Sequence, residues 1–90
     1  MKKADFIRNV AEQCDISQSK ASECFEAMVG TITQCLKDDE SLTFVGFGTF
    51  SVKHRAARMG RNPRTGEAIQ IKAANVPAFK AGKALKEALN

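Results

Sequence analysis

The amino-acid sequence predicts an α+β protein, in which two helices precede short antiparallel strands and a last helix. Apolar residues recur at helical spacing through the first third of the chain. Farther on, apolar and polar residues alternate and are interrupted by glycine and proline, as in strands joined by turns. A chain of 90 residues has room for one domain. We therefore expect one compact unit with one protruding arm.

The first two helices are predicted by their apolar stripes. The first stripe indicates a helix over residues 3–14 and consists of Phe6, Ile7, Val10, Ala11 and Cys14. A polar segment ends this helix, and either Ser17 or Ser19 can cap the next one. The second stripe runs from Ala21 to Leu36 and is wider than one short helix can cover. It predicts a packing partner, which is either the rest of the fold or a second subunit.

A short hairpin with one buried face is predicted after the second helix. Leu42 and Phe44 alternate with polar residues before a glycine-containing turn, and Phe50 and Val52 do so after it. We interpret the segment 46–48, Gly-Phe-Gly, as a tight turn. A phosphate-binding loop would need a third glycine, a βαβ unit or a following Lys-Ser/Thr pair, and the sequence has none of these.

Residues 53–73 predict a two-stranded ribbon with many cations and few core-forming side chains. An Asn-Pro-Arg-Thr-Gly turn signal separates its two strands. Each strand has about ten residues, so at about 3.3 Å per residue the ribbon reaches roughly 30 Å. After Pro77 we expect a last helix in residues 81–90, with Leu85 and Leu89 facing inward.

Catalytic, metal-binding and membrane functions find no support in the residues. The one histidine, His54, lies among cations, where we expect it to be solvated or to face a phosphate. Cysteine and histidine show no metal-ligand spacing, and we expect no enzymatic activity and no cofactor. Since no apolar run approaches the roughly 20 residues of a membrane span and no signal peptide is apparent, we expect a cytoplasmic protein.

The three cysteines, Cys14, Cys24 and Cys35, are expected to be small buried hydrophobes in a reducing compartment. Cys24 and Cys35 are predicted to lie on one helix about 16 Å apart, too far for a disulfide bond. A redox sensor is the alternative interpretation.

Charge is divided unequally along the chain and predicts a nucleic-acid ligand. Residues 1–52 contain five Lys/Arg and eight Asp/Glu, a net charge of −3, whereas residues 53–90 contain nine and two, a net charge of +7. Such asymmetry indicates one part that folds and pairs and another that meets a polyanion. Two groups of cations can form one continuous cationic surface. Lys53 and Arg55 share one face of a predicted strand, and Lys80, Lys83 and Lys86 share one side of the last predicted helix.

Pro63, at the predicted tip of the ribbon, has two interpretations. Proline favours the second position of a turn, and Gly66 can end that turn. A rigid apolar ring at the tip of a cationic ribbon can also wedge between base pairs in the minor groove and kink the duplex. Arginines at the tip would then lie where the groove potential is most negative.

The segment Gly46–Lys86, GFGTFSVKHRAARMGRNPRTGEAIQIKAANVPAFKAGKALK, resembles the bacterial histone-like HU / integration host factor family. Its most specific part is Gly-Arg-Asn-Pro-x-Thr-Gly, residues 60–66, and the resemblance extends over the whole chain. It implies an intertwined dimer with a helical base, a small antiparallel sheet and a protruding two-stranded β-ribbon arm per subunit. The implied single domain, 1–90, has a dimerisation part in 1–40, a sheet in 41–52 and 74–80, a DNA-binding arm in 53–73 and a helix in 81–90.

The resemblance also implies a role for individual residues. Pro63 would intercalate, Phe47, Phe50 and Phe79 would help to close the dimer, and the other DNA contacts would be Lys3, Lys53, Arg55, Arg58, Arg61, Asn62, Arg64, Lys72, Lys80, Lys83 and Lys86. The implied function is to wrap and bend double-stranded DNA, preferably bent, nicked or distorted, without strong sequence preference, and to compact the nucleoid. The alternatives are a sequence-specific host-factor-like subunit, an RNA-binding role and a protein-interaction module. Homodimer and heterodimer both remain open.

Overall fold

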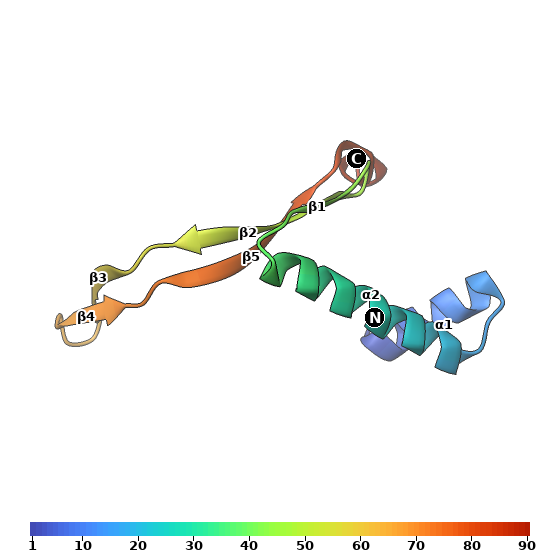
Figure 1. Ribbon diagram of the computed structural model, residues 1–90, viewed down its shortest axis with the longest axis horizontal. Helices are drawn as coiled ribbons and strands as arrows, with labels where there is room; N and C mark the ends of the chain where they lie inside the picture. The colour runs from blue at the N-terminus through green and yellow to red at the C-terminus, as the bar shows by residue number, and fades with distance from the viewer. The chain divides into compact units, whose positions relative to one another are not determined.

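The computed structural model describes all residues, Met1–Asn90, and confirms the α+β fold class (Figure 1). The chain divides into two compact units, Met1–Gln34 and Cys35–Asn90. This differs from the single compact unit with an arm that we expected. The elements are, in order, α1 (Lys3–Cys14), α2 (Gln18–Lys37), β1 (Leu42–Phe44), β2 (Gly48–Arg55), β3 (Arg58–Arg61), β4 (Ala68–Ile71), β5 (Ala74–Ala81) and α3 (Lys83–Ala88).

The helical unit begins with α1, whose bounds are those predicted. The helix is followed by its C-cap residue, Asp15, which adopts the left-handed conformation with φ of 54°. Ser17 then caps α2, because its Oγ accepts a hydrogen bond from the Lys20 N–H at 3.0 Å. This contact decides between the two serines that the sequence left open.

The core of the helical unit is small, because only Ile7, Ala11 and Ala21 are buried hydrophobic residues. Val10 and Phe25 pack against them. Several other apolar side chains of α1 and α2 line an open groove whose surface is entirely apolar: Phe6, Cys24, Met28, Val29 and Ile32. The two helices therefore cover only part of their own apolar stripes.

The prediction that the cysteines are buried is wrong. Cys14 and Cys24 are exposed, Cys35 is half-buried, and all three are free thiols. Cys14 is the last residue of α1, where nothing packs over it, and Cys24 lies in the open apolar groove. Burial of Cys24 requires a partner that covers the groove.

The second unit contains a three-stranded antiparallel sheet in the order β1-β2-β5. The β1–β2 turn bends sharply at Gly46, with φ of 83°, and is closed by the Phe47 N–H, which donates to Phe44 O at 2.9 Å. The chain packs back onto this turn, where the Gly82 N–H donates to Phe47 O at 2.8 Å. The turn thus holds the start of α3.

Four phenylalanines gather on one side of this sheet. Ring centroids are 4.8 Å apart for Phe50 and Phe79 and 5.6 Å apart for Phe47 and Phe79, and Phe44 lies 6.2 Å from Phe50. Phe44, Phe47 and Phe79 are nevertheless each 41–50% exposed. The aromatic cluster is therefore one half of a core, open on its outer side.

The last helix is shorter than predicted and buries fewer apolar side chains. α3 contains six residues, and Leu85 is half-buried as expected. Leu89 was expected to face inward but is 80% exposed, because α3 ends at Ala88 and Leu89 lies beyond its last turn. No helix of the structure combines the length and the apolar character that a membrane span requires.

Candidate nucleic-acid interface

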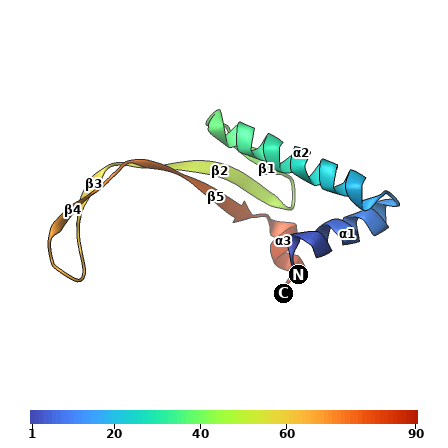
Figure 2. The same cartoon turned by 90° about the horizontal axis from the view of Figure 1, so that it is seen from below.

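The arm, residues 53–73, extends the sheet as a narrow ribbon. Figure 2 shows β2 and β5 continuing into β3 and β4 as one curved pair of strands. The ladder is interrupted between them, so that β3 and β4 form a two-stranded sheet of their own. The register is continuous, because Arg55 lies opposite Ala74 and Arg58, three residues on, lies opposite Ile71. Across the interruption, Arg55 Nη2 donates to Lys72 O at 3.3 Å.

The tip of the arm, which we call the tip turn (residues 62–67), is closed by its own hydrogen bonds. The Asn62 N–H donates to Glu67 O at 2.8 Å, and the Gly66 N–H donates to Asn62 O at 2.7 Å. Asn62 Oδ1 also accepts the Arg64 N–H at 2.9 Å. Gly66 has φ of 73°, which favours glycine. The turn leaves Pro63 exposed at the far end of the ribbon.

The sheet register brings the cations at the root of the arm to one face. Residues directly opposite each other in an antiparallel pair share a face, and alternate residues along a strand do so too. Thr49 lies opposite Lys80 in the β2–β5 ladder, so Lys80 shares a face with Lys53 and Arg55. The other face carries the aromatic cluster. One side of this sheet is therefore cationic and the other aromatic.

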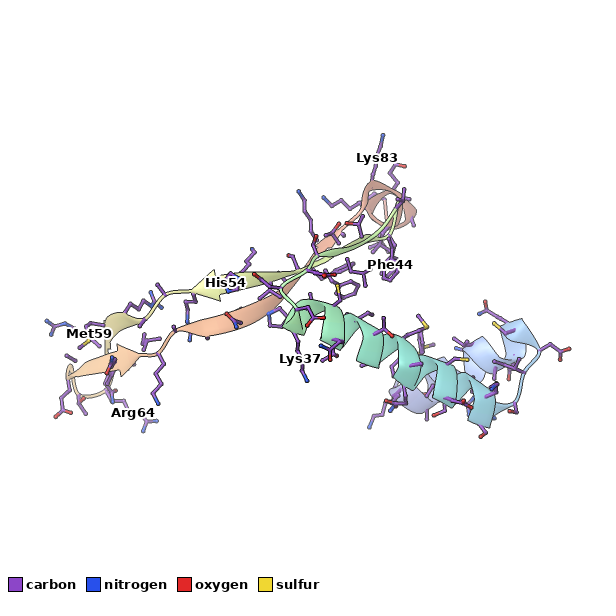
Figure 3. All side chains as sticks on the ribbon, in the orientation of Figure 1. Lys37, Phe44, His54, Met59, Arg64 and Lys83 are labelled. Atoms are coloured by element: carbon purple, nitrogen blue, oxygen red, sulfur yellow. The ribbon has the colours of Figure 1, made fainter.

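Nearer the tip, the cations occupy both faces of the ribbon. Arg58 shares a face with Ile71, whereas Arg61 is on the opposite face with Ala68. Arg61 Nη1 also donates to Gly66 O at 3.3 Å, which ties this side chain to the tip turn. Figure 3 shows Arg64 at the far end of the ribbon. The end of the arm is thus surrounded by guanidinium groups.

Most of the predicted DNA contacts lie in the second unit, along the arm, on β5 and on α3. Lys72 is exposed at the interruption of the ladder, and Lys83 and Lys86 are exposed on α3. The exception is Lys3, which lies in the helical unit. Its ammonium pairs with Glu26 and lies 5.3 Å from the centre of the Phe25 ring.

The side chain of His54 is exposed, in agreement with the expectation that it is solvated, but it also makes two contacts that were not predicted. Both ring nitrogens make hydrogen bonds within the second unit: Nδ1 lies 2.7 Å from Asn75 Oδ1, and Nε2 lies 2.9 Å from Asp39 Oδ1. These hydrogen bonds, first that of Asn75 and then that of Asp39 with its charge, raise the pKa of His54 above 6.5. The sequence spacing contains no signal for this contact.

Comparison with known proteins identifies the family. The model of a family described as "Bacterial DNA-binding protein" matches residues 1–90. The chain belongs to this family. Among curated members, DNA-binding protein HU-beta of Salmonella typhimurium is 50% identical over 90 residues, which cover 100% of both chains. DNA-binding protein HU-alpha of Vibrio proteolyticus is 53% identical over 89 residues, 99% of each chain.

Solved structures of the bacterial DNA-binding family have the same fold. The cocrystal structure of Anabaena HU with DNA matches with a TM-score of 0.90 and 38% identity, over 99% of this chain and 97% of that chain. HU from Thermotoga maritima matches with a TM-score of 0.73 and 29% identity over 100% of both chains. The resemblance inferred from the motif in residues 60–66 is confirmed.

Proposed function

We propose that the chain is a histone-like protein of the nucleoid that binds, wraps and bends double-stranded DNA without strong sequence preference. The observation that carries this proposal is the arm itself. A ribbon with arginines on both faces, an interrupted ladder and no core beneath it is stabilised poorly by its own contacts. A duplex supplies what the ribbon lacks, because phosphates on both sides of a groove can pair with cations on both faces.

The arm residues of this proposal act in two ways. Arg58, Arg61 and Arg64, with Asn62 and Lys72, contact the minor groove and its flanking phosphates. Lys53, Arg55 and Lys80, on one face of the sheet, contact the backbone nearer the body, as do Lys83, Lys86 and Lys3. The likeness to the Anabaena HU–DNA structure supports this arrangement. Phosphate contacts of this kind position the protein without specifying sequence.

An intertwined dimer completes the proposed protein. The helical unit buries only three hydrophobic residues, and both its groove and the aromatic cluster are open. Exposed apolar surfaces of this kind mark interaction sites. A second chain would cover them, with Phe47, Phe50 and Phe79 packing across the interface. One HU-like domain per chain, 1–90, would then become compact only in the dimer.

Pro63→Ala is expected to reduce DNA bending more than DNA affinity. Pro63 is exposed at the end of a turn that holds its shape through Asn62 and Gly66, so the proline ring can be presented to a base step as a wedge. The arginines that supply the electrostatic affinity stay in place. End-to-end fluorescence distances in a labelled duplex, at saturating protein, measure the bend. Equal bending by the variant and the parent protein would contradict the wedge.

A gel-shift titration at two salt concentrations tests the function. We expect a nicked duplex to bind more tightly than an intact one, because a kink costs less there, with little dependence on sequence. Neutralising Z phosphates gives a slope of log affinity against log salt near −0.9Z. A strong preference for one duplex sequence would favour the host-factor-like alternative, equal competition by RNA an RNA-binding role, and salt-independent binding a protein-interaction module.

A further inference from the structure

His54 joins three segments of the second unit at the root of the arm. It lies on β2, its Nδ1 contacts Asn75 on β5 at 2.7 Å, and its Nε2 contacts Asp39 in the connection between α2 and β1 at 2.9 Å. His54 and Asn75 are directly opposite each other in the ladder, one pair before its last pair. The contact therefore fastens both strands of the arm to the connection that follows α2.

The place of this contact matters because the ladder stops beside it. A hollow at this point is lined by His54, Arg55, Ala56, Ala73, Ala74 and Asn75. No backbone ladder continues from residue 56 to the start of β3. The side-chain contacts of His54 and the bond from Arg55 to Lys72 O thus brace the root of the arm from outside the ladder.

The partners favour the charged form of the ring, because Asp39 is a carboxylate and, with the Asn75 amide oriented as it is, both neighbouring atoms are acceptors. Both acceptors are oxygen atoms, and an imidazolium donates from both nitrogens, whereas a neutral imidazole donates from one only. Among the charged neighbours, Arg55 bonds to Lys72 O, Lys37 ends α2, and Asp38 and Glu40 flank Asp39 in the connection. Lys53 is on the opposite face of β2. Asp39 is therefore the carboxylate that balances the imidazolium.

We propose that His54 is a positioning residue for the DNA-binding arm: its protonated ring ties Asp39 to Asn75 and fixes the arm root, and deprotonation removes the charge that holds Asp39. A fixed root lowers the ordering cost of binding, so the protonated protein binds DNA more tightly. This inference rests on the proposed function. Because the hydrogen bonds raise the pKa of His54, the stabilisation is fully present below pH 6.5 and is lost as pH rises through the raised value.

The first experiment measures the titration of His54 by NMR. The chain has a single histidine, so its imidazole signals need no assignment. In the parent protein the midpoint is expected above 6.5, and Asp39→Asn is expected to lower it. Glu40→Gln is the matched control, since it removes an equal charge from the same connection without touching His54, and it should change the midpoint less. An ordinary midpoint, or equal shifts in the two variants, would overturn the proposal.

The second experiment measures the affinity of the protein for a nicked duplex at pH 6 and at pH 8, at constant salt concentration. We expect the parent to bind about two- to fivefold more tightly at pH 6, the range of one exposed ion pair. His54→Gln, which cannot become charged, should bind with a ratio near one. The same ratio in parent and variant would overturn the positioning role while leaving the proposed function intact. Absence of binding at both pH values would overturn the proposed function and this inference with it.

Discussion

Replacing Arg58, Arg61 and Arg64 together with glutamine is expected to weaken DNA binding by on the order of 100-fold at moderate salt. These three guanidinium groups surround the end of the arm, on both faces and at its tip. If each one neutralises a phosphate, their loss lowers the slope of log affinity against log salt by about 2.7 per chain. A fluorescence anisotropy titration over a series of salt concentrations measures both quantities.

A control variant of equal charge separates local contacts from net charge. Arg8, Lys20 and Lys37 are exposed cations of α1 and α2, and their replacement by glutamine also removes three positive charges per chain. The pairs of Arg8 with Asp5 and of Lys20 with Glu23 are exposed, so breaking them costs little stability. An equal loss of affinity and slope in this control would show that net charge, rather than the arm, governs binding.

Gly82→Ala is expected to destabilise the fold by about 2 kcal/mol, a value typical of overpacking. A Cβ at this position would lie 2.7 Å from both the carbonyl carbon and the oxygen of Gly46. These are backbone atoms of the β1–β2 turn, which cannot move aside as a side chain can. The substitution would also disturb the bond from the Gly82 N–H to Phe47 O. Urea unfolding at fixed protein concentration measures the change.

Gly30→Ala is the control for this prediction. A Cβ on Gly30 meets nothing within 4 Å, and the residue lies inside α2, where alanine is favoured over glycine by about 1 kcal/mol. This variant should therefore be slightly more stable than the parent protein. If Gly82→Ala were as stable as the parent, the close approach of the β1–β2 turn to residue 82 would be refuted.

Local patterns predicted much of the fold. The helix predicted over residues 3–14 has the bounds of α1, since helical periodicity depends only on neighbours along the chain. The alternation around Phe44 and Phe50 likewise predicted the β1–β2 hairpin. The shared face of Lys53 and Arg55 follows from strand geometry alone.

Features that depend on distant residues could not be predicted in this way. His54 is 15 residues from Asp39 and 21 from Asn75, and the contact depends on the ladder register and on the path of the connection after α2. Burial of the cysteines and of Leu89 was predicted from residue type, whereas exposure depends on what packs over each position. The wide apolar stripe of α2 did indicate that α2 needs a packing partner. It did not indicate which apolar residues of α2 are left uncovered by α1.

The interruption of the ladder divides the arm into two separately paired segments, one formed by β2 with β5 and the other by β3 with β4. Each segment has its own backbone hydrogen bonds, so a change of angle between the two segments would break no strand pairing. No residue is inserted at the interruption, so the two segments keep one common register. In the proposed function, a bend at this point would let the same cations meet duplexes of different curvature, with the change in backbone angles confined to a few small residues such as Ala56, Ala57 and Ala73.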